Sequence, residues 1–179
     1  IQNGNNTNVT YFNATSNTSL TCILVDDATY STTNWTNIDA TTSFNEVSCN
    51  IYISPKIYLQ GPISNPTDAG LMNDDLRSNG YLPTTSPYTD VLTCDASVFN
   101  LGGTSGTGAI DDDIVDWVWV ELRDENDNTS VIDSQSALLQ RDGDIVGVDG
   151  ISELSFSQSS GNYFVSIAHR NHIGIITAS

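Results

Sequence analysis

A short run of alternating residues, Asp116–Arg123 (DWVWVELR), constrains the fold more than any other part of the chain. Val118 and Val120 fall on one side of a period-two pattern, whereas Trp117 and Trp119 fall on the other. β-Branched and aromatic residues suit a pleated surface that is half buried. We therefore predict a central strand of an antiparallel sheet, with an aromatic wall on one face.

Further short strands are predicted on the C-terminal side of this run. Each is a stretch of apolar residues bounded by turn formers such as Asp142-Gly143-Asp144. The predicted strands are Val131–Arg141, Ile145–Val148, Leu154–Phe156, Tyr163–His169 and Ile173–Thr177. A spacing of about 8–12 residues with turns between strands is typical of an all-β sandwich. The fold is therefore predicted to be mainly β, with an antiparallel β-sandwich as its larger part.

The segment before the central run has weaker signals. Ile51–Pro55 is a predicted linker, and Lys56–Gln60 (KIYLQ) predicts a strand that ends at Gly61-Pro62. Leu71–Asn79 predicts a short helical turn. Gly102–Gly108 (GGTSGTG) predicts a flexible loop, which lacks the lysine and the following helix of a phosphate-binding loop.

The chain has a formal charge of −17 and only five basic residues. Nucleic acid and anionic membrane surfaces are bound through Lys and Arg, so we expect neither partner. Clustered carboxylates suit hard divalent cations such as Ca²⁺. The same acidity also keeps a secreted protein soluble, so the charge alone does not decide between these two roles.

Three cysteines, Cys22, Cys49 and Cys94, allow one disulfide and one leftover thiol. Cys22 and Cys49 bracket a compact Asn/Thr-rich stretch, and we expect them to pair. Cys94 is then free or bonded to chain outside this sequence. The chain begins at Ile1 and ends at Ser179 after an apolar run without a turn, so we expect a fragment of a larger extracellular protein. The chain has no apolar run of about 20 residues, so we expect no insertion into a membrane.

The first fifty residues carry a repeat signal. Val9, Phe12 and Ala14 fill the apolar positions of the leucine-rich repeat template L-x-x-L-x-L-x-x-N, and Asn17 fills its last position. Residues 20–25 repeat the first half of the template. In this architecture the apolar side chains point into a solenoid and the Asn side chain bonds backbone groups at the turn. One and a half repeats cannot bury a core alone, so this segment predicts the end of a solenoid.

The residues that follow predict a cap. Tyr30 and Trp35 stand among turn formers where they would cover the last coil, which a disulfide between Cys22 and Cys49 would staple. Residues 5–49 resemble the C-terminal end of leucine-rich repeat proteins secreted by Bacteroidota. The matching residues are Cys22, Ile23, Val25, Asp26, Asp27, Tyr30, Ser31, Asn34, Trp35, Thr36, Asn37, Ile38, Asp39, Phe44 and Cys49.

Residues 55–179 are similar to a β-sandwich domain that follows such repeats in the same group of secreted proteins. The similarity rests on four motifs, which lie in Lys56–Pro62, Asp116–Arg123, Leu138–Asp144 and His169–His172. In that group a sorting signal for the type IX secretion system lies farther along the chain. The resemblance implies export and architecture, without an established activity. We predict terminal repeat coils and a cap at residues 1–50 and a β-sandwich domain at residues 51–179.

The densest polar cluster is His169–His172 (HRNH). A zinc or acid–base site needs a third ligand or an orienting partner, and the sequence spacing shows none. A turn between two strands explains the same residues, with Arg170 pairing with Asp116 or Glu121 across the sheet. The turn is our preferred interpretation.

Asp124–Asn128 (DENDN) resembles the calcium-binding linker of cadherins, and Ca²⁺ is the one cofactor that the sequence suggests. The candidate ligands are Asp124, Asn126, Asp127 and Asn128. Cadherin sites also take carboxylates from a preceding domain, which cannot be placed here. A hairpin loop between Arg123 and Val131 explains the same residues without an ion. Asp111–Asp113 and Asp142–Asp144 are weaker versions of this case.

Four aromatic residues are candidates for a sugar-binding platform, because aromatic faces stack on the CH groups of pyranose rings. They are Tyr81, Tyr88, Trp117 and Trp119. The two tryptophans share one face of the predicted strand, as a platform requires. The alternative is that this face is buried against a second sheet.

No serine–histidine–acid set, zinc-protease motif or nucleotide loop is present in the sequence. We therefore expect a non-catalytic, adhesin-like protein of the cell surface or extracellular space. Its expected partners are a protein or glycan ligand and the type IX secretion machinery. Two alternatives stay open: a carbohydrate-binding module attached to a secreted polysaccharide-degrading enzyme, and a structural spacer stiffened by Ca²⁺.

Overall fold

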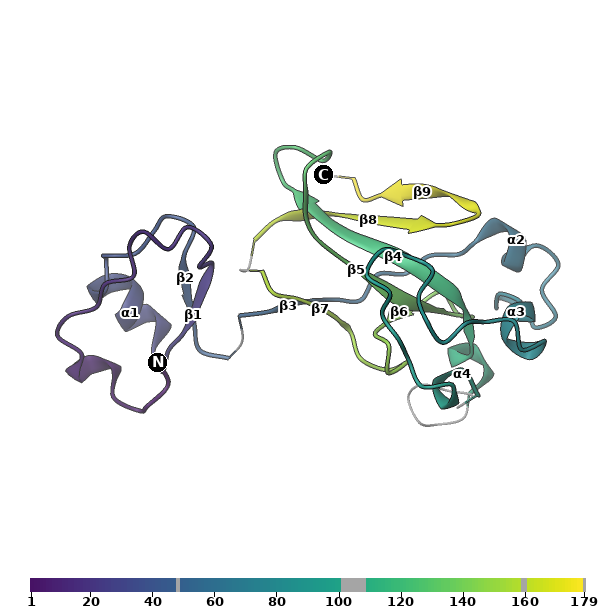
Figure 1. The fold of residues 1–179 in the computed structure, drawn as a ribbon, viewed down its shortest axis with the longest axis horizontal. Helices are drawn as coiled ribbons and strands as arrows, with labels where there is room; N and C mark the ends of the chain where they lie inside the picture. Colours follow the sequence, from purple (N-terminus) through teal and green to yellow (C-terminus); the bar gives the residue numbers. More distant parts are fainter. Residues whose placement is uncertain (48, 101–108, 159–160, 179) are drawn as a thin grey trace. The chain divides into compact units, whose positions relative to one another are not determined.

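The computed structural model describes residues 1–47, 49–100, 109–158 and 161–178 (Figure 1). The chain divides into two compact units. Unit 1 contains Ile1–Ile51 and Phe156–Gly161, and unit 2 contains Tyr52–Ser155 and Asn162–Ser179. None of the helices in the described ranges is long and apolar enough to cross a membrane. The predicted loop at Gly102–Gly108 lies outside the described residues.

Unit 1 is built from short elements. They are η1 (Asn6–Asn8), β1 (Cys22–Leu24), α1 (Ala28–Asn34) and β2 (Ser43–Asn45). β1 and β2 pair in parallel, and Ala14 forms a further parallel bridge with Ile38. Asp27 caps α1, because its side chain accepts a hydrogen bond from the Tyr30 N–H at 2.7 Å. Unit 1 therefore combines a capped helix with parallel pairing between distant segments.

An aromatic cluster forms the core of unit 1. Trp35 is buried and stacks on Phe12 with ring centroids 4.7 Å apart, and its ring meets that of Phe44 edge-on at 5.7 Å. The Trp35 Nε1–H donates to the Val9 carbonyl at 3.3 Å. The Asn17 side chain donates to two backbone carbonyls of its own turn, as the repeat template predicts for this position. Two parallel pairings are not a solenoid, so the repeat interpretation stays a prediction.

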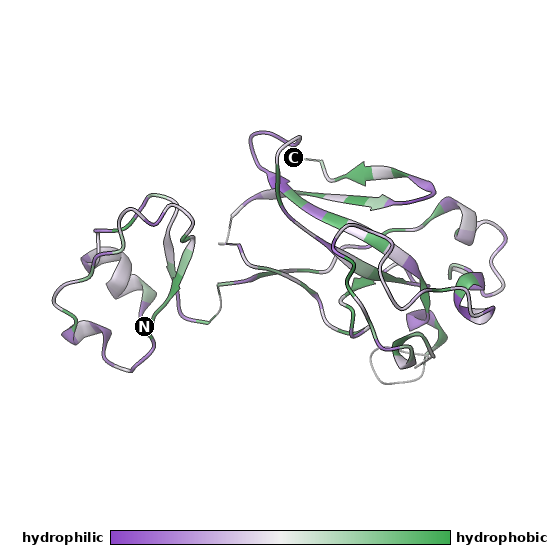
Figure 2. Cartoon of the chain, in the orientation of Figure 1, coloured by the Kyte–Doolittle hydropathy of each residue, from purple (hydrophilic) through white to green (hydrophobic). Residues whose placement is uncertain are grey.

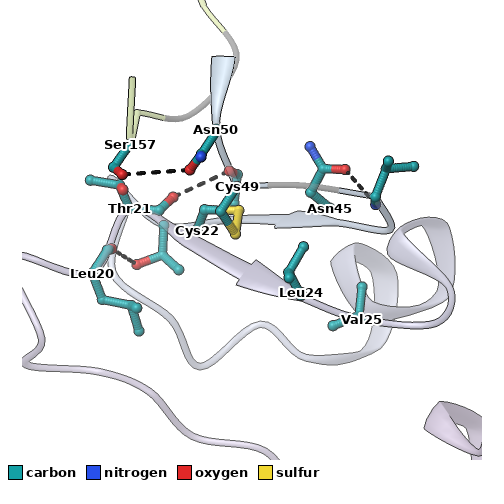
Figure 3. Close-up of a disulfide and its surroundings, with 12 residues drawn as sticks. Leu20, Thr21, Cys22, Leu24, Val25, Asn45, Cys49, Asn50 and Ser157 are labelled. Atoms are coloured by element: carbon teal, nitrogen blue, oxygen red, sulfur yellow. Dashed lines mark hydrogen bonds between the residues drawn. A yellow bond between two sulfur atoms is a disulfide. The ribbon is translucent and has the colours of Figure 1, made fainter. Parts of the chain in front are cut away.

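A disulfide joins Cys22, at the start of β1, to Cys49, with Cα atoms 5.5 Å apart (Figure 3). Next to it the Thr42 hydroxyl donates to the Leu20 carbonyl at 2.6 Å. Among the described residues Cys94 is the free cysteine, and burial raises the pKa of its thiol. A thiol with a raised pKa holds little thiolate at neutral pH and is therefore poorly reactive.

Unit 2 centres on a five-stranded antiparallel sheet with the order β6-β5-β4-β8-β9 (Figure 1). The strands are β4 (Ile114–Asp124), β5 (Val131–Gln140), β6 (Ile145–Val146), β8 (Tyr163–His169) and β9 (His172–Ile176). The prediction of a central antiparallel strand is confirmed, since β4 lies between β5 and β8. A two-residue turn, Arg170-Asn171, joins β8 to β9.

The first half of β4, up to Val118, is buried on both faces, whereas Trp119, Glu121 and Arg123 in its second half are half-buried on one face, so the prediction of a half-buried strand holds for the second half alone. Trp117 has no exposed surface and lies in one core cluster with Leu82 and with Phe99 of α4 (Ser97–Asn100). Val118, which faces the other way along the strand, is also fully buried. Residues from a loop and a helix therefore cover Trp117, where the prediction placed a second sheet.

The prediction of a strand at Lys56–Gln60 is wrong, because the backbone groups of this segment do not form a continuous ladder with another strand. Ile57 N–H donates to the Gly143 carbonyl at 2.9 Å, and Leu59 N–H donates to a methionine sulfur at 3.2 Å. The last residue of the segment begins α2 (Gln60–Ile63). Gly143 has φ +95°, and a Cβ there would lie 2.9 Å from the Ile57 oxygen, so this turn requires glycine.

The remaining elements of the sequence before and after the sheet are short. They are β3 (Ile51–Ile53), α3 (Asp75–Ser78), η2 (Ile110–Asp112) and β7 (Leu154–Phe156). The boundary between units 1 and 2 falls inside the predicted linker Ile51–Pro55, but its first three residues form β3, which pairs with β7. α3 lies inside the predicted helical turn Leu71–Asn79 and is shorter than it.

Apart from His172 and Gly174, the edge strand β9 consists of isoleucines, and it is largely exposed (Figure 2). Ile173 is 93 % exposed and Ile175 is 49 % exposed. The edge is therefore hydrophobic and open, a type of strand that favours pairing with other chains.

Replacing Cys22 and Cys49 by serine is expected to lower the free energy of unfolding of unit 1 by about 3 kcal/mol, because the cross-link closes a loop of 27 residues in the unfolded chain. Denaturant unfolding measures this loss, with Cys94→Ser as the matched control. A double variant as stable as the control would contradict the expectation.

Candidate functional site

Two aromatic rings meet beside the central strand and line a shallow, open depression of about 660 Å³. Trp119 comes from β4, and Tyr88 comes from the irregular segment that precedes α4. Their ring centroids are 5.7 Å apart and their planes are tilted by 36°. The depression is lined by Pro87, Tyr88, Thr89, Trp119, Glu121 and Ala168. We call these six residues the aromatic shelf.

Hydrogen bonds at its hydroxyl fix the Tyr88 ring. The hydroxyl is shared between the carbonyls of Trp117 and Ala168, at 3.3 and 3.4 Å, and accepts from the Arg170 N–H at 3.2 Å. Burial raises the pKa of Tyr88, so the phenol stays protonated at neutral pH. The ring is therefore tied to both β4 and the β8–β9 turn, while one side stays open to the depression.

The Trp119 ring is held from its polar edge. Its Nε1–H donates to Glu121 Oε1 at 3.0 Å, and the other oxygen of Glu121 accepts from Arg123 Nε at 2.9 Å. Arg123 also donates to the Asn128 carbonyl at 2.8 Å. A half-buried tryptophan, a carboxylate and a guanidinium thus form one fixed row along β4.

Only two of the four predicted platform residues come together. Trp117 is fully buried, and its Nε1–H donates to the Pro83 carbonyl at 2.8 Å, so its place in a ligand platform is wrong. Tyr81 is 74 % exposed and does not line the depression. Tyr88 and Trp119 remain, because both line the depression and their rings are in contact.

The predicted calcium loop joins β4 to β5 and is organised by its own backbone. Asp124 Oδ1 accepts from the N–H groups of Asn126 and Asp127 at 2.8 and 3.1 Å. Asp127 Oδ1 accepts from Thr129 N–H and hydroxyl, and the hydroxyl bond chiefly lowers the pKa of Asp127. In the described part of the chain, no three His, Cys, Asp or Glu residues form a group that could hold a metal ion. Calcium binding by Asp124, Asn126, Asp127 and Asn128 stays a prediction.

The two weaker acidic runs have basic partners. Lys56 Nζ lies 3.2 Å from Asp142 and 3.1 Å from Asp144. Asp113 pairs with Arg77 at 3.0 Å, while burial raises the pKa of Asp113. These carboxylates form ion pairs that join the β5–β6 turn to Lys56 and the residue before β4 to α3.

The turn interpretation of the HRNH segment holds, and the structure adds a partner. Arg170 Nη2 lies 3.0 and 2.9 Å from the two carboxylate oxygens of Asp116, which was one of its two expected partners. His169 Nε2 also lies 3.0 Å from Asp116 Oδ2, and His169 Nδ1 lies 2.9 Å from His172 Nδ1. Sequence reasoning missed this orienting carboxylate. Extending the β4–β8 register beyond Trp119 would have placed it beside the turn.

Comparison of the chain with protein-family models, curated proteins and solved structures gives no match. The geometry of the chain itself therefore carries the functional argument.

Trp117→Ala is expected to lower the free energy of unfolding by about 3–5 kcal/mol, because it empties a fully buried site. Tyr81→Ala, at an exposed ring, is expected to change it by less than about 0.5 kcal/mol. Denaturant unfolding of both variants tests the assignment. Equal stability of the two variants would contradict the burial of Trp117.

Proposed function

We propose that unit 2 binds glycans without catalysis, through the aromatic shelf, as part of an adhesin-like protein of the cell surface or extracellular space. One observation carries the proposal. Tyr88 and Trp119 hold their rings 5.7 Å apart along an open depression whose rim carries a carboxylate and a hydroxyl. Both rings are restrained by hydrogen bonds from their polar atoms.

This arrangement matches the chemistry of a sugar ring. The CH face of a pyranose is apolar and packs on aromatic faces, while its hydroxyls need hydrogen-bond partners at the edge. Glu121 and Thr89 supply such partners. Because the rings are restrained before binding, little side-chain entropy is lost when the sugar docks.

Charge narrows the class of glycan. The chain carries a net charge of −17, and the carboxylate of Glu121 lies at the shelf. Uronic acids and sialic acids would be repelled, because Arg123 and Arg170, the cations bonded to shelf residues in the described part of the chain, already pair with Glu121 at 2.6 Å and with Asp116 at 2.9 Å. The proposed ligands are therefore neutral hexoses or amino sugars.

The disulfide supports the extracellular location, since such bonds persist in oxidising compartments. Parallel strands, the turn role of Asn17 and the aromatic core of unit 1 are consistent with the end of a leucine-rich repeat. Export through the type IX route rests on the resemblance of the sequence. The same shelf would also serve a carbohydrate-binding module attached to a secreted polysaccharide-degrading enzyme.

A glycan array probed with the full 179-residue chain tests the proposal, followed by calorimetry on the best ligand. Trp119→Ala is expected to weaken binding about tenfold or more, equivalent to about 1.4 kcal/mol. Tyr81→Ala removes an exposed ring outside the shelf and is the matched control, with unchanged affinity expected. Binding that survives Trp119→Ala, or an array without any bound glycan, would overturn the proposal.

A further inference from the structure

A second hollow in unit 2, of about 290 Å³, shares no lining residue with the aromatic shelf. We call it the histidine cavity. Its walls are Leu59, Gly61, Pro62, Asn73, Asp75, Leu76, Val115, Asp116, His169, Asn171 and His172. They come from α2 and its flank, from α3, from the start of β4 and from the β8–β9 turn. His172 stands where α2 meets this turn.

We assign the protons of the two histidines from the hydrogen bonds around them. His169 Nδ1 accepts from the Asn171 N–H at 3.2 Å, so its proton is on Nε2 and is donated to Asp116 Oδ2 at 3.0 Å. His172 Nδ1 must then donate to His169 Nδ1 at 2.9 Å. The unprotonated nitrogen of His172 is therefore Nε2.

That nitrogen accepts from the backbone of α2. The Gly61 N–H points to His172 Nε2 at 3.4 Å. Gly61 lies in the first turn of α2, where N–H groups have no partner within the helix. A Cβ at position 61 would lie 3.4 Å from the same nitrogen, so backbone and ring are in direct contact. One neutral imidazole thus accepts a hydrogen bond from one of the free N–H groups at the start of α2.

We propose that His172 is a proton-operated latch on the histidine cavity. When Nε2 takes up a proton, the acceptor for Gly61 becomes a donor, and two N–H groups face each other. The contact then becomes repulsive, α2 leaves the turn, and the cavity opens on that side. The His172–His169 bond survives, because Nδ1–H still donates.

The charged groups around His172 affect the pH range in which the latch works. Asp116 on β4 is paired with Arg170 of the turn and with His169, Asp75 on α3 lines the cavity, and Lys56 lines the neighbouring hollow with His172. Burial is the main cause that lowers the pKa of His172, with His169 adding to it and Asp116 opposing it. The closed form is therefore present at neutral pH and is lost as the pH falls through the lowered pKa.

Nuclear magnetic resonance on the full chain tests the latch between about pH 7.5 and pH 4.5. The ¹³Cε1 signal of His172 reports its protonation, and the heteronuclear ¹⁵N nuclear Overhauser effects of Gly61, Ile63 and Ser64 report the mobility of α2. We expect these effects to fall with the same midpoint as His172, below pH 6.5, its ordinary value.

His172→Gln keeps a hydrogen-bond acceptor that does not titrate, so α2 should then stay ordered across the whole range. His172→Ala removes the acceptor and should leave α2 mobile at every pH. Titration of His172 with no change in α2, or a loss of order in His172→Gln at the same pH, would overturn the latch. Glycan binding does not enter either readout, so the proposed function can fail independently.

Discussion

The hydrogen bonds of the buried Asp116 carboxylate hold together the end of the sheet where β4 meets the β8–β9 turn. Its side chain is 4 % exposed, and it accepts hydrogen bonds from its neighbour Trp117 N–H, from Arg170 and from His169. An unpaired carboxylate at this depth would cost several kcal/mol, whereas full hydrogen bonding makes it tolerable. Because the last regular β4–β8 pair is Trp119–Ala168, Asp116 extends the link between β4 and the β8–β9 turn beyond the sheet ladder.

The longer strands of the sheet were predicted from the sequence. β4 has an alternating pattern of apolar residues, β5 and β8 are stretches with apolar residues bounded by turn formers, and each strand lies where it was expected. Lys56–Gln60 also suits a strand by composition, but its described pairing is the single antiparallel bridge between Lys56 and Asp144, and the Leu59 N–H bonds a sulfur. Composition shows which segments suit a strand. It does not show whether a partner strand, which can lie far away in the sequence, is there to form the hydrogen bonds.

The candidate site was likewise predictable from the sequence only in part. Trp119 was visible in the sequence because of its alternation with valine, but its partner Tyr88 comes from a segment without regular structure. Trp117 has the same sequence signature as Trp119 and a different environment, since Trp117 lies in a core cluster with Leu82 whereas Trp119 lines the open depression. To predict that Tyr88 meets Trp119, one needs the register of β4 with β8 and the path of the segment that contains Tyr88. Strand patterns indicate the register but not the path.

Arg170 is the residue through which the aromatic shelf and the histidine cavity touch. Its backbone N–H holds the Tyr88 hydroxyl at 3.2 Å, and its guanidinium holds Asp116. Protonation of His172 adds positive charge two hydrogen bonds away from Asp116, which strengthens the pull on that carboxylate and leaves the Arg170 pair in place. The bonds that hold Tyr88 come from β4, from β8 and from the Arg170 N–H, so in the proposed latch acid opens the cavity and leaves the aromatic shelf in place.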